Sequence, residues 1–150
     1  MPTVHLAFSP APQYVRTARL VSVAVARRAG VADELLDWVR LAVGDACGRA
    51  VARHVRYGVD ELIQVIMSDD GPYEVRVIDA CGTDIAEEPQ VAAEDPAVAE
   101  DADRMGETLL AGLVEDLQVT RGPEGTEVRM AWPVRRRLSE AARTRHGGRT

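Results

Sequence analysis

The chain has 150 residues, the size of one ordinary domain, and its 46% apolar content is enough to form a buried core. All 18 basic side chains are arginine, and 24 acidic side chains bring the net charge to -6. The chain contains no lysine and no asparagine. These absences exclude a Schiff-base or P-loop lysine and an asparagine amide as a metal ligand. A codon bias of the genome is the favoured explanation of their origin.

Two cysteines, Cys47 and Cys81, are too few for a disulfide scaffold or a closed zinc site. The N-terminus lacks a basic segment followed by an apolar run, and no apolar stretch approaches the roughly 18 residues that span a bilayer. We therefore expect a soluble, cytoplasmic protein with no membrane contact, whose thiols are structural. The 4% aromatic content offers little for stacking on nucleic-acid bases.

The N-terminal third predicts a strand followed by two helices. Residues 4–8 alternate, and the prolines at 10 and 12 end that strand and begin a helix. Apolar positions then recur at helical spacing over 13–28, with Gly30 as the stop signal. A second apolar stripe predicts a helix from Asp33, whose carboxylate suits the positive end, to about Val55.

The remainder predicts two hairpins separated by a loop and a helix. Strands over 62–67 and 73–78 flank the turn sequence Ser-Asp-Asp-Gly-Pro. Helical spacing resumes over 105–117. Strands over 118–121 and 126–132 then flank a Gly-Pro-Glu-Gly turn. The order β-α-α-β-β-loop-α-β-β indicates an α+β, two-layer sandwich with helices on one face of a mixed, mainly antiparallel sheet.

Two segments differ sharply in charge from the rest of the chain. Residues 83–103 hold eight acids, two prolines and no base, which predicts an acidic lid loop or a solvated linker. Residues 134–150 are rich in arginine and predict a disordered tail after a single domain over 1–133. Without residues 135 onward, 12 arginines face 23 acids, a charge of -11 that disfavours nucleic-acid binding.

Three segments resemble the RsbW-type anti-sigma factors, which are serine kinases with the GHKL (histidine-kinase-like ATPase) fold. The matching runs are Pro-Ala-Pro-Gln-Tyr-Val through Arg19, Asp33-Glu34 through Leu-Ala-Val-Gly-Asp-Ala-Cys, and Val-Ile-Asp at 77–79. The resemblance covers about residues 4–132. It implies a homodimer that holds a sigma factor inactive and phosphorylates an anti-anti-sigma protein of the STAS type.

The resemblance also identifies the residues where a kinase would act. The family places an acidic base and a Mg²⁺-binding asparagine four residues apart on one helix face; Asp45 and Arg49 stand there. Arginine has no acceptor, so Mg²⁺ cannot be held in the family's way. An ordinary i,i+4 contact between Asp45 and Arg49 is the alternative interpretation. The sequence thus predicts Asp45 as a candidate base and a missing metal site.

The base and phosphate motifs of the family are partly retained. Its Asp-x-Gly, which receives adenine, corresponds to Asp79, with the glycine moved one place to Gly82. Its Gly-Thr corresponds to Gly125-Thr126, where the threonine supports the aspartate. Its glycine-rich phosphate turn is reduced to Arg104 and Gly106. ATP or ADP binding is therefore expected to be weak or lost, unless Arg49 and Arg104 neutralise phosphate without Mg²⁺.

Arg19 matches the arginine that the family presents to its protein partners, although a solvated helix-face arginine is the alternative. The sequence therefore favours an anti-sigma factor that acts by sequestration, is released by a STAS protein and has weakened or lost kinase activity. The alternatives are an active serine kinase and, less favoured, a nucleic-acid module that uses the arginine tail.

Overall fold

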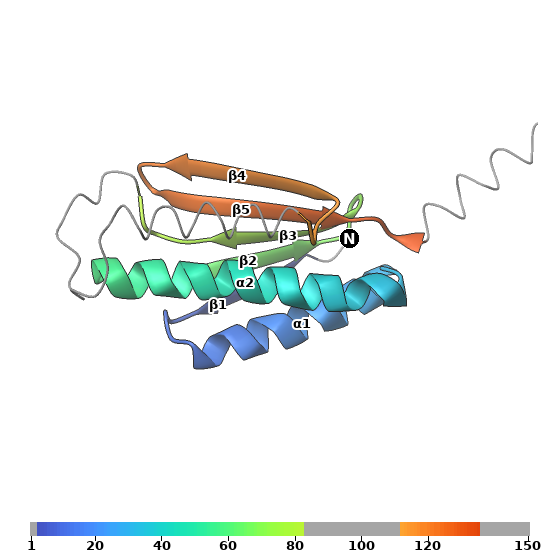
Figure 1. Ribbon diagram of the computed structural model, residues 1–150, viewed down its shortest axis with the longest axis horizontal. Helices are drawn as coiled ribbons and strands as arrows, with labels where there is room; N and C mark the ends of the chain where they lie inside the picture. The colour runs from blue at the N-terminus through green and yellow to red at the C-terminus, as the bar shows by residue number, and fades with distance from the viewer. Residues whose placement is uncertain (1–2, 83–111, 136–150) are drawn as a thin grey trace, which may run out of the picture.

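The computed structural model describes residues 3–82 and 112–135, in which two helices lie on one side of a five-stranded sheet (Figure 1). Every strand pair in the described part is antiparallel, so the mixed sheet expected from the sequence is corrected in this respect. The α+β, two-layer architecture is confirmed. The sheet order is β1-β2-β3-β5-β4, with β1 Val4–Phe8, β2 Ile63–Ser68, β3 Tyr73–Ile78, β4 Asp116–Gly122 and β5 Gly125–Trp132.

The helix layer consists of α1 (Gln13–Ala29) and α2 (Asp33–Tyr57), which pack along each other. Each helix ends at a glycine in the left-handed region, Gly30 at φ 100° and Gly58 at φ 64°. Glycine adopts this conformation without the steric cost of a Cβ, which explains why both helices stop there. Only three residues separate α1 from α2, so the chain reverses there and α2 runs back along α1 (Figure 1).

The core lies between this layer and strands β1, β2, β3 and β5. The alternate inward residues of β3, Tyr73, Val75 and Val77, are buried beneath the helices. The Tyr73 ring stacks on Trp132 of β5 at a centroid distance of 6.1 Å. Its hydroxyl donates a 2.7 Å hydrogen bond to the backbone oxygen of Ser22 in α1, which ties the two layers together. The buried hydroxyl of Tyr73 therefore has a hydrogen-bond partner, so the ring can pack in the core without leaving this polar atom unpaired.

The opposite face of the sheet carries a ladder of alternating charges. Arg129 bridges Glu74 at 2.9 Å and Asp116 at 3.2 Å, and Arg76 bridges Glu127 at 3.0 Å. These side chains are partly exposed, so each pair contributes at most about 1 kcal/mol. They identify this as a polar face, whereas the helices cover the apolar one.

Two boundaries predicted from the sequence are wrong. The predicted helix over 105–117 does not reach its expected end, because Leu117 lies in β4 opposite Met130. Val134, assigned to the disordered tail, is buried in the core, and the amide of Arg135 donates to the oxygen of Gly30 at 2.8 Å. Residues 83–111 and 136–150, which include the predicted acidic lid, lie outside the described residues. No helix in the described ranges is long and apolar enough to cross a membrane.

Candidate functional site

The candidate site is centred on Asp79, which follows the last residue of β3 and is only 3% exposed. Its backbone amide donates to the oxygen of Thr126 at 3.0 Å. Its side-chain Oδ1 accepts hydrogen bonds from the backbone amides of Cys81 at 2.9 Å and Thr126 at 3.1 Å. The β3 end and the start of β5 are thus held together through one carboxylate.

The other carboxylate oxygen of Asp79 is held by Arg53 of α2. The Nε and Nη2 atoms of Arg53 both donate to Oδ2, the former at 2.9 Å. The side chain of Asp79 is fully buried and that of Arg53 is 15% exposed, so the pair is shielded from water. A carboxylate offers about four lone-pair positions. Four N–H donors of the protein occupy them here.

His54, the next residue of α2, holds the same turn from the helix side. The backbone amide of Ala80 donates to its Nε2 at 3.0 Å, which requires a neutral ring with the proton on Nδ1. Burial lowers the pKa of His54 from its ordinary value of 6.5, and the nearby Asp79 carboxylate opposes this shift. Arg53 and His54, consecutive residues of α2, therefore both hydrogen-bond to the segment that follows β3.

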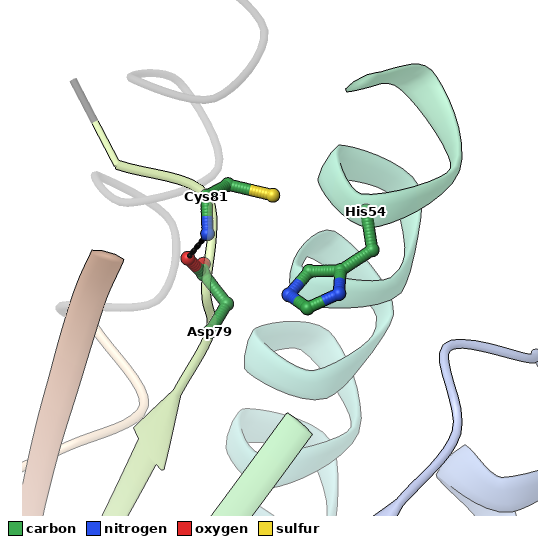
Figure 2. Close-up of side chains that lie close together, drawn as sticks. All are labelled: His54, Asp79 and Cys81. Atoms are coloured by element: carbon green, nitrogen blue, oxygen red, sulfur yellow. Dashed lines mark hydrogen bonds between the residues drawn. The ribbon is translucent and has the colours of Figure 1, made fainter. Parts of the chain in front are cut away.

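His54, Asp79 and Cys81 bring a nitrogen, an oxygen and a sulfur within 4.8 Å of one another. Figure 2 shows these three side chains close together between α2 and the end of β3. This donor set resembles a metal site, but Nε2 of His54 already accepts from Ala80 and the carboxylate is fully engaged. Burial also raises the pKa of the Cys81 thiol to about 12, which disfavours the thiolate that a metal requires. In this arrangement the three residues hold the turn after β3 in place through hydrogen bonds and do not form a metal site.

Two glycines allow the β3 end to approach the β4–β5 turn. A Cβ at Gly82 would lie 1.8 Å from the backbone oxygen of Pro123. A Cβ at Gly125 would lie 1.9 Å from the backbone oxygen of Asp79. Backbone atoms of the protein fill the space beside both glycines. Gly82, which the sequence predicted to leave room for a bound base, therefore leaves room for the β4–β5 turn instead.

A cavity of 490 Å³ opens beside this junction. Asp79, Ala80 and Thr126 line it together with the β4–β5 turn and the start of β2 at Gln64. Its size suits a small organic ligand. The cavity and the buried carboxylate therefore share one corner of the fold.

The pair predicted as base and metal ligand lies on α2, two turns before His54. Nη2 of Arg49 is 2.9 Å from Oδ2 of Asp45, in an i,i+4 ion pair. The Arg49 side chain is 15% exposed and that of Asp45 is 43% exposed. The i,i+4 contact between Asp45 and Arg49, the alternative to a base and metal-ligand pair, is thus formed.

The model of the histidine kinase-like ATPase domain matches residues 8–132. The chain belongs to this family. A search of curated proteins found no match. Membership accounts for the order of elements and implies nucleotide binding in general.

As arranged, the described residues around Asp79 do not fit the adenine base of a nucleotide. The acceptor positions of Asp79 are filled, so an adenine amino group meets no open lone pair there. Thr126 reaches Asp79 through its backbone amide. Arg104 and Gly106, the predicted phosphate contacts, lie outside the described residues.

Sequence reasoning missed Arg53 and His54 as members of the site. Arg53 stands four residues after Arg49, one further turn along the helix face that carries Asp45, and this spacing was the available signal. Its partner is 26 residues away in the chain, so the contact arises only through the packing of α2 on β3.

Arg19, predicted to contact partners, lies on α1 at its contact with α2. A Cβ at Gly44 would lie 2.5 Å from Cδ of Arg19, so the arginine stem fills the space that this glycine leaves. Among the described residues, no carboxylate lies within ion-pair distance of the Arg19 guanidinium. Arg19 is thus a partly buried cation whose stem lies against Gly44 of α2.

Proposed function

We propose that this ATPase-family domain is an anti-sigma factor that sequesters a sigma factor and is released by an anti-anti-sigma protein of the STAS type. In this proposal it works in the cytoplasm as a homodimer, and its ATP-dependent kinase activity is weakened or lost. The alternative is an active serine kinase of the same family that phosphorylates the STAS protein.

The ion pair between Asp45 and Arg49 is the observation that carries the proposal. A guanidinium carries a permanent positive charge and has only donors, so Arg49 cannot coordinate Mg²⁺. Its 2.9 Å contact with Asp45 also engages the carboxylate that a kinase would use as base. Binding of a protein partner needs neither group, which favours sequestration over phosphorylation.

The helix layer supports a protein-binding role. Leu20, beside Arg19 on α1, is 61% exposed, and Leu41, three residues before Gly44 on α2, is 52% exposed. Exposed apolar side chains around a positioned arginine are typical of protein interfaces. The Arg19 guanidinium suits an acidic group on the partner.

The charge of the chain supports the choice of partner. Excluding residues 135 onward, 23 acids face 12 arginines. Such a body repels nucleic acid and attracts a basic surface, such as the DNA-binding face of a sigma factor. Complementary charge of this kind accelerates association and lowers affinity as salt is added.

Capture of sigma factors by the tagged full chain tests the proposal directly. We expect the chain to retain a sigma factor, and Arg19→Glu to lose it while remaining folded. Arg28→Glu is the matched control, because it makes the same charge change on an exposed residue about half a turn away around α1. Equal binding by wild type and Arg19→Glu would contradict the role of Arg19, and no capture at all would contradict the function.

A phosphotransfer assay separates the two candidate functions. The chain is incubated with labelled ATP, Mg²⁺ and a STAS protein that releases the captured sigma factor. Sequestration with weakened or lost kinase activity predicts little or no transfer by wild type. Transfer that Asp45→Asn abolishes would establish the kinase instead.

A further inference from the structure

We propose that Arg53 occupies the base subsite of this domain in place of a nucleotide, so that adenine nucleotides bind only after the Arg53–Asp79 pair opens. The inference deepens the proposed function and rests on it for the weakened nucleotide chemistry. Sigma-factor capture and nucleotide titration are separate assays, so either can fail alone.

The first argument is the saturation of the Asp79 carboxylate. Oδ1 accepts the amides of Cys81 and Thr126, and Oδ2 accepts both donors from Arg53. The two amides belong to the backbone junction and cannot leave without unfolding it. Arg53 is the one side-chain partner in this set, and it is therefore the contact that a ligand must replace.

The second argument is location. Asp79, Ala80 and Thr126 line the 490 Å³ cavity, so the residue that carries the buried carboxylate lies at the edge of a space large enough for a base. The guanidinium reaches it from α2 on the buried side. A planar guanidinium and an aminopurine edge both present N–H donors, and one can stand in for the other at a carboxylate.

The third argument is electrostatic. Arg53 neutralises a carboxylate whose side chain is wholly buried, a role that a neutral base would not fill. The corner between β3 and β5 is thus complete without a ligand. A domain built in this way gains little from nucleotide, which is the behaviour that a sequestering protein needs when it no longer couples binding to phosphorylation.

Titration of the full chain with ADP tests the inference by calorimetry and by thermal shift, with Mg²⁺ and with EDTA. We expect wild type to give neither heat nor a shift in Tm. Arg53→Lys keeps the charge but not the planar fork, which frees an acceptor position on Oδ2. It should bind ADP detectably, with a gain in affinity of roughly 10- to 100-fold over the limit set by wild type, which is the contribution of one hydrogen bond to a charged group.

Three controls make the result specific to this carboxylate. Arg40→Lys, on an exposed ion pair 13 residues earlier in α2 and about 20 Å away along the helix, should behave as wild type. The double variant Arg53→Lys with Asp79→Asn should lose the gained affinity. Adenosine should show the gain, and inorganic diphosphate should not, because the change concerns the base.

Equal ADP affinity in wild type and folded Arg53→Lys would overturn the inference. Tight ADP binding by wild type, or unchanged affinity in the double variant, would do the same. Arg53→Met, which keeps the stem and removes the donors, provides the second route: we expect it to bind adenosine, and a folded Arg53→Met that does not bind refutes the proposal.

Discussion

The buried ring of His54 predicts a specific dependence of stability on pH. His54 is 0% exposed, and its Nε2 accepts the amide of Ala80 at 3.0 Å. Protonation would remove this acceptor and place a second cation beside Arg53. The folded protein therefore favours the neutral ring, and its pKa lies below 6.5.

The sign and size of the effect follow from linkage. Because the folded-state pKa is lowered, the unfolded chain binds the proton first as the pH falls below 6.5. The stabilisation by neutral His54 is thus fully present above that value and is lost as acid is added, down to the folded-state pKa. At about pH 5.5, one pH unit below 6.5, the free energy of unfolding should therefore have fallen, by at most about 1.4 kcal/mol from this group.

Urea unfolding at about pH 7.5 and pH 5.5 measures this loss. His54→Gln removes the titrating ring, so the loss between the two pH values should shrink by the share that His54 contributes, which is at most about 1.4 kcal/mol. His5→Gln, on an exposed residue of β1, is the matched control and should keep the wild-type dependence. The reasoning fails if His54→Gln loses as much stability on acidification as wild type does.

Further predictions concern the junction and the helices. Gly82→Ala should destabilise the domain by about 3 kcal/mol, because its Cβ would meet Pro123, whereas Gly48→Ala, with nothing within 4 Å of the added Cβ, should stabilise α2 by about 0.5 kcal/mol or more in the same urea assay. Gly44→Ala should weaken sigma-factor capture without removing Arg19, because the added Cβ displaces the arginine stem. Unchanged capture would show that the packing of Arg19 on Gly44 does not contribute to partner binding. Zinc should leave Tm unchanged in thermal-shift measurements, because the ligand atoms of His54 and Asp79 are engaged in hydrogen bonds. A zinc-dependent rise in Tm would contradict this assignment.

The sequence by itself determined the elements whose signals are local. Alternating residues and helical spacing predicted both helices and two hairpins, because the period of apolar residues reflects which face of each element is buried. Gly30 ended α1 as predicted, in the left-handed conformation that glycine favours. The boundaries at Leu117 and Val134 were missed, because sheet pairing and core burial of these residues depend on distant partners.

For the site, the sequence identified Asp45, Arg49, Asp79 and Thr126 as positions of interest, while only the tertiary structure decided what they contact. The Asp45–Arg49 pair was predictable in part, since four residues along a helix bring two side chains together. Arg53 and Asp79 are 26 residues apart, on a helix and after a strand, and no local pattern places them in contact. Their ion pair exists because the packing of α2 on β3 buries a carboxylate that needs a cation beside it.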